Sequence, residues 1–484
     1  MNIRDSVKTL LHEHCFINGV WVAADNGATI AVKNPATDAE IAHVPNAGKV
    51  ETQRAIAAAA QALPAWRNKT AGERSAILKR WHGLLMQHQY ALGELMTLEQ
   101  GKPLTEATGE IAYAARYVEW YAEEATRVYG ETIPGAQENQ RIIVTREPVG
   151  VCVAITPWNF PAAMITRKVA PALAVGCTIV VKPASETPLT ALAMAALAAE
   201  AGVPNGVFSV VTGNANAIGE AFTSSNIVRK LSFTGSTAVG AKLMAACAPT
   251  VKKVSLELGG NAPFLVFDDA DIDAAVQGLM DSKFRNAGQT CVCANRVYVQ
   301  RGVYQEFSEK LVAKVAALKV GNGLDKGVQI GPLISVAAVE KVEEHIADAV
   351  QHGAQIAFGG ERHKLGGTWF TPTILLDGNQ NMRCTREETF GPVAPLIPFS
   401  EESEAIEYAN ATEFGLAAYF YAQNASRIHR VTEAIEAGIL GVNTGLISNA
   451  TAPFGGVKAS GIGREGGHQG LDEYCELKYI CVQM

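Results

Sequence analysis

Two cysteines separated by a single residue, Cys291 and Cys293, stand in the stretch 284–294. The residues just before them, 286–290, are all small or polar, which is typical of a turn with an accessible backbone. A cysteine in such a turn can offer its thiol as a nucleophile and its own backbone N–H to a developing negative charge. Taken alone, the stretch also fits a pair of half-buried cysteines that only fill space. The rest of the sequence must decide between these interpretations.

Short apolar strands alternate with helices from residue 150 onward. We expect strands at residues 151–155, 178–181, 207–211, 230–233 and 253–256. We expect helices at residues 162–175, 190–201, 215–223 and 237–246. This alternation predicts a parallel sheet with helices on both faces. Ligands of such sheets bind beyond the carboxyl ends of the strands, so the residues that directly follow each strand are the candidates for a site.

A second α/β unit is predicted from residue 262. We expect strands at residues 264–266, 296–299, 394–399, 419–421 and 439–442, and a long helix at residues 304–318. Asp268, Asp269 and Asp271 stand together before another helical segment. Acidic side chains favour the first turn of a helix, so we interpret these three as helix caps rather than as metal ligands.

The remaining segments are predicted to be mostly helical at the start and extended near the end. Apolar residues recur at helical spacing in residues 52–62, 73–88 and 106–129, so we expect the first hundred-odd residues to be mainly helical. Residues 133–149 and 474–482 alternate instead, which is typical of exposed strands. We expect these two segments to serve as an arm toward another copy of the chain, and we therefore expect a homo-oligomer.

Composition excludes several classes of protein. A chain of 484 residues with 48% hydrophobic and 18% charged residues is typical of a soluble protein with more than one domain. Its net charge of −7 favours neither nucleic acid nor an anionic membrane. Residues 1–20 lack the apolar core of a signal peptide, and the longest apolar run, 189–199, is too short to span a bilayer. The chain is expected to be cytoplasmic.

The nine cysteines are scattered and odd in number, which indicates a reducing compartment rather than a disulfide framework. His12, His14 and Cys15 cluster near the start of the chain but lack a fourth ligand at a recognisable spacing. We therefore expect no metal site.

Polar and small residues follow the predicted strands in a specific order. They stand at residues 156–161, 182–185, 234–236, 257–261, 387–392 and 453–461, with the cysteine stretch between the fourth and fifth of these segments. Together they closely resemble the aldehyde dehydrogenase superfamily over essentially the whole chain. The resemblance implies an α/β fold with a Rossmann-type parallel-sheet cofactor domain, an α/β catalytic domain and a small β oligomerisation arm.

The resemblance also implies domain limits. The cofactor-binding domain would comprise residues 1–130 and 150–257, and the catalytic domain residues 258–462. The oligomerisation segments would be residues 131–149 and 463–484, and the assembly a tetramer or a dimer.

Aldehyde oxidation accounts for three residue types in these segments. The resemblance implies that Cys291 adds to the aldehyde carbonyl and that the Asn159 amide and the Cys291 N–H stabilise the oxyanion. The thiohemiacetal then passes a hydride to a nicotinamide, and Glu257 acts as the base that hydrolyses the remaining thioester. A relative that transfers the acyl group to coenzyme A has no need of such a carboxylate, so a free acid is the expected product. Because all three residues are present, a structural protein that has lost the reaction is disfavoured.

The cofactor site follows from the same resemblance. Lys182 would lie along the adenosine ribose, Ser236 near the pyrophosphate and Glu388 on the nicotinamide ribose. The other residues expected in this crevice are Thr156, Trp158, Ser185, Gly213, Gly235 and Phe390. Relatives that prefer NAD commonly carry a glutamate where this chain has Ser185, so we expect NADP to be preferred and NAD to be the alternative. The adjacent Glu186 would oppose this preference if it turned inward.

Within the superfamily the chain is most similar to NADP-type succinate-semialdehyde dehydrogenases, through residues 164–168, 283–293 and 443–448. The similarity implies a semialdehyde substrate whose distal carboxylate is bound by Arg167, Arg285 and Ser448. The alternative for either arginine is a surface or interdomain ion pair. Glutarate semialdehyde has one more methylene and would make the same contacts, so it remains an alternative substrate, as does a broader range of aldehydes.

Some of these relatives are thought to protect the nucleophile by a reversible disulfide. Oxidised Cys291 would find Cys293 two residues away, so we expect a redox switch between them. The alternative is that Cys293 is a small apolar side chain that fills space.

Overall fold

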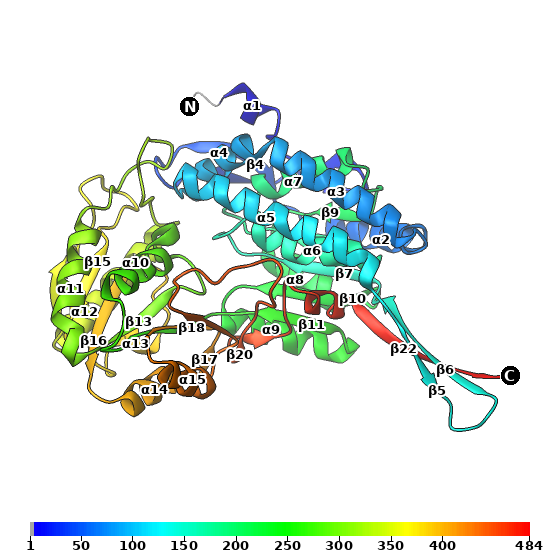
Figure 1. The fold of residues 1–484 in the computed structure, drawn as a ribbon. Helices are drawn as coiled ribbons and strands as arrows, with labels where there is room; N and C mark the ends of the chain where they lie inside the picture. Colours follow the sequence, from blue (N-terminus) through cyan, green and yellow to red (C-terminus); the bar gives the residue numbers. More distant parts are fainter. Residues whose placement is uncertain (1–3) are drawn as a thin grey trace.

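The computed structural model describes residues 4–484, and two α/β lobes with a projecting three-stranded sheet are visible in it (Figure 1). Residues 1–3, the start of the predicted segment 1–130, lie outside the described residues. We call the part built around the first sheet the first lobe and the part built around the second sheet the second lobe. The mixed α/β class expected from the sequence is confirmed.

The first lobe is built on an eight-stranded sheet with the order β2-β1-β9-β8-β7-β10-β11-β21. Its five central strands are parallel: β7 Val151–Ile155, β8 Thr178–Lys182, β9 Phe208–Val210, β10 Val228–Thr234 and β11 Lys253–Glu257. All five predicted strands are confirmed to within two residues. Because β7, β10 and β11 are neighbours, the segments that follow them meet at one edge of the sheet.

Helices cover both faces of this sheet, as predicted. One face carries α2 Lys49–Arg67, α8 Ala215–Ser224 and α9 Thr237–Cys247; the other carries α3 Ala71–Gln87, α4 Gln89–Gln100, α5 Leu104–Glu124, α6 Ala163–Val175 and α7 Leu189–Glu200. Along β7, Val151 and Val153 join one apolar cluster while Cys152 and Ala154 join the other. This alternation follows from the two-residue period of a strand that is buried on both faces.

The second lobe holds a seven-stranded sheet with the order β14-β15-β16-β13-β12-β18-β19. The strands are β12 Ala262–Val266, β13 Ala294–Gln300, β14 Gln355–Phe358, β15 Thr373–Leu376, β16 Val393–Phe399, β18 Ala417–Tyr421 and β19 Ile439–Val442. Its helices are α10 Ile272–Lys283, α11 Arg301–Ala316, α12 Val336–Gln351, α13 Arg383–Arg386, α14 Glu402–Asn410 and α15 Ala425–Ala434. The predicted second α/β unit is confirmed, although α12, α14 and α15 were not expected.

The three aspartates before α10 have two different roles: one caps the helix and two form ion pairs. Asp271 caps the helix by accepting a hydrogen bond from the backbone N–H of Ala274 at 3.0 Å, as predicted. Asp268 and Asp269 do not cap α10, because both form ion pairs with Arg427 on α15. The cap interpretation was therefore right for one residue and wrong for two. Within residues 4–484 no group of three or more side chains is arranged to hold a metal ion.

The two segments with an alternating pattern form one projecting sheet. β5 Glu131–Pro134, β6 Gln140–Pro148 and β22 Cys475–Gln483 lie in the order β22-β6-β5, with Cys475 opposite Pro148 and Gln483 opposite Gln140. Figure 1 shows this sheet extending away from both lobes, with the C-terminus at its far end. Its strands are mostly exposed, so the predicted arm is confirmed as a structural element.

The expectation of a mainly helical start was wrong for residues 4–45. Four short strands occur there: β1 Cys15–Ile17, β2 Val20–Val22, β3 Thr29–Lys33 and β4 Glu40–Pro45. Strands of three to six residues leave little periodicity to detect, and β1 is held by the first sheet through Phe16 opposite Val210.

The remaining short elements are α1 Asp5–Lys8, η1 Ala125–Arg127, η2 Ala248–Thr250, η3 Arg285–Gly288, β17 Phe414–Gly415, β20 Val457–Lys458, β21 Gly461–Ile462 and α16 Gln469–Asp472. Across the part of the chain that the structure covers, no helix has both the length and the apolar character needed to cross a membrane.

Candidate active site

A cavity of about 420 Å³ lies where the carboxyl ends of the first sheet meet the cysteine loop of the second lobe. Seven of the residues singled out in the sequence line it: Trp158, Asn159, Gly235, Ser236, Cys291, Glu388 and Phe390. They come from the segments after β7 and β10, from the loop before β13 and from the segment after α13. Residues more than 200 positions apart in the sequence are therefore gathered in one place.

Cys291 sits in a tight turn, in which the backbone N–H of Cys293 donates to the carbonyl of Thr290 at 3.0 Å. The thiol of Cys291 is half-buried against the core of the second lobe. Burial, with the carboxylates of Glu388 and Glu257, raises the pKa of Cys291 to about 12, although Arg167 and Arg285 act in the opposite direction. The Cys291 side chain is therefore a neutral thiol at pH 7.

Asn159 is buried in the connection between β7 and α6 and is held firmly to the cysteine loop. Its side-chain Nδ2 donates to the carbonyl of Gln289 at 3.1 Å, and its own carbonyl accepts from Lys102 Nζ at 2.7 Å. A primary amide has two N–H donors, so one stays available for a ligand oxygen. Among the described residues, the backbone N–H of Cys291 likewise has no acceptor. The two groups provide the donors that an oxyanion requires.

Glu257 ends β11 and is only 3% exposed. Neither of its carboxylate oxygens has a hydrogen-bond partner in the part of the chain that is described. A Cβ on Gly455 would lie 2.8 Å from Glu257 Oε1, so a glycine is needed there to leave room for the carboxylate. Burial raises the pKa of Glu257 well above its usual range, and the Glu465 carboxylate adds to this, while Lys168, Arg167 and Arg464 oppose it. This carboxyl therefore keeps its proton to a higher pH than an exposed glutamate does.

A buried pair of charges beside Glu257 was not found from the sequence. Lys168 on α6 is fully buried, forms an ion pair with Glu465 and donates to Thr234 Oγ1 at 2.6 Å. The two partners are 297 residues apart, and nothing in the sequence connects Lys168 with Glu465. The pair places one positive and one negative charge close enough to influence the proton affinity of Glu257.

The opposite wall of the cavity presents an aromatic pair and a carboxyl. The rings of Trp158 and Phe390 meet edge to face with centroids 5.6 Å apart. Glu388 Oε1 accepts from the backbone N–H of Gly260 at 3.3 Å, and burial raises the pKa of Glu388 to about 7. Ser236 precedes the first turn of α9, and its side chain makes no capping bond to that helix. The N-terminal N–H groups of α9 therefore face this cavity without a side-chain cap, an arrangement that suits an anion.

The expected adenosine side extends beyond this cavity. Ser185 lines a neighbouring cavity of about 750 Å³, and Glu186 lines both, so the two spaces adjoin at Glu186. Lys182 is buried beneath them, with Nζ donating to the carbonyl of Pro183 at 2.9 Å. Thr156 Oγ1 is also buried and has no partner among residues 4–484. Two adjoining cavities, with a helix N-terminus at the first of them, fit an elongated, anionic dinucleotide.

Like Thr156 and Lys182, Gly213 lines neither of these two cavities. It has a φ of 136°, and a Cβ there would collide with the backbone of Ala47. The residue is a glycine because β9 must end in close contact with the segment that follows β4.

Arg167 and Arg285, two of the three residues expected to bind the carboxylate, lie close enough to Cys291 to act on the pKa of its thiol. Arg167 is buried, donates to the Tyr113 hydroxyl and stacks on the Phe454 ring at 4.1 Å. It also forms an ion pair with Glu465 at 3.7 Å, as the alternative for this arginine expected, although the pair is buried. Arg285 stacks on the Phe160 ring at 5.1 Å and makes no hydrogen bond or ion pair with the described chain. Tyr113, Phe160 and Phe454 were not identified from the sequence.

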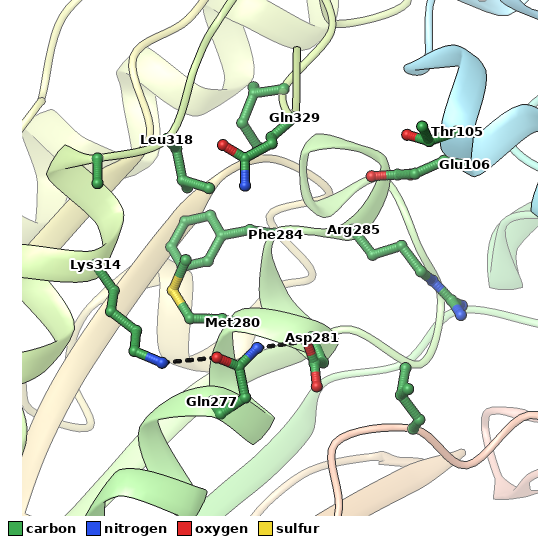
Figure 2. Close-up of a pocket in the computed structure, with 13 residues that line it drawn as sticks. Thr105, Glu106, Gln277, Met280, Asp281, Phe284, Arg285, Lys314, Leu318 and Gln329 are labelled. Atoms are coloured by element: carbon green, nitrogen blue, oxygen red, sulfur yellow. Dashed lines mark hydrogen bonds between the residues drawn. The ribbon is translucent and has the colours of Figure 1, made fainter. Parts of the chain in front are cut away.

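Arg285 also borders a third cavity, of about 450 Å³, which lies mainly between α10 and α11 (Figure 2). Lys314 and Gln277 line its far side and are joined by a hydrogen bond of 2.7 Å. Figure 2 shows the Arg285 side chain extending away from these residues. Ser448 lines none of the three cavities and its side chain makes no hydrogen bond within residues 4–484.

Cys293 is turned away from the cavity that Cys291 lines. It is buried, and its Sγ donates to the carbonyls of Lys283 at 3.5 Å and Ala294 at 3.4 Å. Both cysteines are free thiols in this structure. A disulfide between them stays a prediction.

Comparison with known proteins places the chain in a family. Succinate-semialdehyde dehydrogenase (NADP(+)) GabD of Escherichia coli (strain K12) is 61% identical over 482 residues, which cover 100% of both chains. Glutarate-semialdehyde dehydrogenase of Pseudomonas aeruginosa is 60% identical and covers 100% of this chain and 99% of its own. The crystal structure of an NADP-dependent enzyme of E. coli superposes with a TM-score of 0.99 at 60% identity, over the whole of both chains. Residues 21–480 match the aldehyde dehydrogenase family, and the protein therefore belongs to that family of oxidoreductases.

Proposed function

We propose that this protein oxidises succinate semialdehyde to succinate with NADP. The substrate assignment rests on Arg167 and Arg285. Both cations act to lower the pKa of Cys291, and the Arg285 side chain forms no hydrogen bond or ion pair within the described chain. A guanidinium without a counterion beside the nucleophile favours a substrate that brings its own carboxylate. The name of the E. coli relative, with its succinate semialdehyde and NADP(+), agrees with this assignment.

The first half of the reaction needs a nucleophile and an oxyanion site. The Cys291 thiol gives up its proton to solvent, Sγ forms a bond to the aldehyde carbon, and the electron pair of the C=O bond moves to the oxygen. The free N–H of Asn159 Nδ2 and the backbone N–H of Cys291 donate to that oxygen. The two arginines hold the distal carboxylate, so the aldehyde carbon is presented to the sulfur in a fixed orientation.

The second half is oxidation followed by hydrolysis. Bound NADP supplies an acceptor for the hydride on the aldehyde carbon, which leaves a thioester on Cys291. Glu257 removes a proton from water as the water oxygen attacks the thioester carbon, and the Cys291 sulfur leaves. Because both oxygens of Glu257 are without partners, the carboxylate can accept that proton without breaking an existing bond.

The dinucleotide would occupy the two adjoining cavities. We assign its nicotinamide end to the walls formed by Trp158, Glu388 and Phe390, and its pyrophosphate to Gly235 and Ser236 at the start of α9. The adenosine end would reach Thr156, Lys182 and Ser185, with Gly213 supporting the backbone below it. NADP is assigned as the preferred form because Ser185 offers a hydroxyl donor where a carboxylate would repel a 2′-phosphate, and NAD remains the alternative.

Changing Ser185 to glutamate tests the coenzyme assignment. The new carboxylate should repel the 2′-phosphate, so the Kd of NADP should rise at least about tenfold more than the Kd of NAD. Fluorescence titration of both coenzymes on the purified protein measures this difference. Ser185→Ala is the matched control and should affect the two coenzymes much less. Equal weakening of NADP and NAD by Ser185→Glu would show that residue 185 does not face the ribose.

Changing Arg285 to alanine tests recognition of the distal carboxylate. Loss of a charge-assisted contact should lower kcat/KM for succinate semialdehyde by about 30-fold, or about 2 kcal/mol, and leave butanal nearly unchanged. Steady-state kinetics on both aldehydes measure the difference. Lys314→Ala removes a cation from the far side of the same cavity and should change neither value. A similar loss on both aldehydes would assign Arg285 to structural support and would favour a broad-specificity enzyme.

Glutarate semialdehyde is the second candidate substrate, and the name of the P. aeruginosa relative favours it. One additional methylene changes binding in a pocket by only about 1 kcal/mol, so the same arginines accept either chain length. The ratio of kcat/KM for the two semialdehydes decides between them. Ser448, the third residue assigned to the carboxylate, would need to turn inward to take part.

We also propose a homo-oligomer, either a tetramer or a dimer, formed through the arm. β22 and β5 have free edges in the described chain, and Leu477 and Tyr479 on β22 are 69% and 63% exposed. Unpaired edges with apolar side chains are suited to pairing with another copy.

We assign residues 131–149 and 463–484 to this assembly, residues 1–130 and 150–257 to the cofactor domain and residues 258–462 to the catalytic domain. The nine free cysteines favour the reducing cytoplasm.

A further inference from the structure

The chain turns sharply just before the nucleophile, at residues that are not glycine. Asn286 and Ala287 have φ values of 51° and 54°, which lie in the left-handed region. Most side chains disfavour this region, although asparagine tolerates it better than alanine. Both residues are almost completely buried. A backbone with this conformation persists only where the surrounding contacts fix it.

The side chain of Asn286 makes those contacts, with the backbone of Asn159 and with the turn that precedes Cys291. Its Nδ2 donates to the carbonyl of Asn159 at 3.1 Å and to the carbonyl of Gln289 at 3.2 Å. Its Oδ1 accepts from Gln100 Nε2 at 3.0 Å. The carbonyl of Gln289 also receives the Asn159 amide. One side chain therefore ties the segment that carries Asn159 to the turn that carries Cys291.

Charged residues of the first lobe also bind the backbones of Asn159 and Asn286. Lys102 donates to the Asn159 carbonyl, the same oxygen that Asn286 contacts, and forms a buried ion pair with Glu110. Glu110 accepts in turn from the backbone N–H of Ala162 at 3.0 Å, at the start of α6. The backbone N–H of Asn286 donates to Glu106 Oε2 at 2.8 Å. Both sides of the junction are thus fixed to α5.

We propose that Asn286 is a positioning residue for oxyanion stabilisation, acting through Asn159 and the Cys291 turn without touching the substrate. The proposal rests on the proposed aldehyde oxidation. Two donors stabilise an oxyanion only when both are directed at the same oxygen. Asn159 follows a strand of the first sheet, whereas Cys291 precedes a strand of the second, so their separation depends on bonds that cross between the lobes. Asn286 makes such bonds, to Asn159, Gln100 and Glu106.

Asn286→Gly is the sharpest test, because glycine accepts the left-handed backbone while the amide is lost. We expect kcat for the proposed substrate to fall about 100-fold, as for a misplaced reacting group or a lost oxyanion donor. The KM and the Kd of NADP should change less than about threefold. Asn286→Asp keeps the shape but presents a carboxylate to two carbonyl oxygens, so its kcat should fall at least as far. Asn18→Gly, in the exposed turn between β1 and β2 with a φ of 53°, is the matched control and should leave kcat unchanged.

Alkylation of Cys291 by iodoacetamide separates positioning from general damage to the loop. This displacement forms no oxyanion, so its rate in Asn286→Gly should stay within about threefold of wild type while kcat falls. In an Asn159→Ala background, Asn286→Gly should then lower kcat by less than about threefold, because the donor that it positions is already absent.

Equal losses in alkylation and kcat, full additivity with Asn159→Ala, or an unchanged kcat in Asn286→Gly would each overturn the proposal. Failure of the proposed function itself is recognised separately, because wild-type protein would then not reduce NADP with the semialdehyde.

Discussion

Cys291→Ala is expected to lower aldehyde oxidation by about 10⁴-fold or more, to the rate without protein. The thiol is the group that forms a covalent bond to the aldehyde carbon, and no other cysteine lines the same cavity. Without that bond no thiohemiacetal is formed, and the hydride cannot leave the aldehyde carbon by this route. Formation of reduced NADP from succinate semialdehyde, followed by absorbance, measures the loss.

Two observations must accompany this loss. The Kd of NADP should stay within about threefold of wild type, since the removed sulfur is a small part of the wall of the cavity. Cys293→Ser is the matched control: a hydroxyl keeps the donor to the Lys283 carbonyl, and the variant should retain most of its activity. Substantial activity in Cys291→Ala would remove Cys291 from the mechanism.

The pH dependence of Cys291 alkylation checks its environment independently. Burial beside Glu388 raises the pKa of Cys291 to about 12. Only the thiolate reacts, so without ligand the rate of alkylation by iodoacetamide should increase continuously from pH 7 to pH 10. A plateau near neutral pH would show that the two arginines outweigh burial and the carboxylates.

Glu257→Gln is expected to stop the reaction after its first half. Acylation and hydride transfer do not require water, so the variant should release close to one reduced NADP per active site in a rapid burst. Turnover should then be lower than that of wild type by about 10²–10⁴-fold, the usual contribution of a general base. Rapid-mixing absorbance measures the burst, and mass spectrometry of the quenched protein detects the acyl group on Cys291.

Chemical rescue provides the control for this variant. Hydroxylamine attacks a thioester without the help of a base, so it should restore turnover in Glu257→Gln and change wild type little. Absence of both the burst and the acyl-enzyme would assign Glu257 to an earlier step than hydrolysis.

Hydrolysis in the wild type should also depend on pH in a defined direction. Burial beside Glu465 raises the pKa of Glu257 well above its usual range, and only the ionised carboxylate accepts a proton from water. The single-turnover rate of thioester hydrolysis should therefore increase with pH across the range in which Glu257 loses its proton. In Glu257→Gln this increase should be absent, and a retained increase would assign the titration to another group.

The sequence by itself determined the parallel sheets and the order of the site segments. The five central strands of the first sheet are short segments rich in apolar residues and separated by helices of ordinary length, so the sequence located them to within two residues. The turn before Cys291 and the carboxylate at the end of β11 are local features with a recognisable composition. Local patterns of this kind depend only on neighbours in the chain, so they can be recognised without a structure.

Other features required the tertiary structure. Strands β1 to β4 are too short to show a period; β1 pairs with β9 of the first sheet, and β3 and β4 pair with each other. Lys168 and Glu465 meet across 297 positions, and Gln100 and Asn286 across 186. The neighbouring sequence does not distinguish a lysine or glutamate that forms a buried ion pair from one that faces solvent. The fold decides their partners, because a buried charge or amide must be matched by whichever chain segment packing brings beside it.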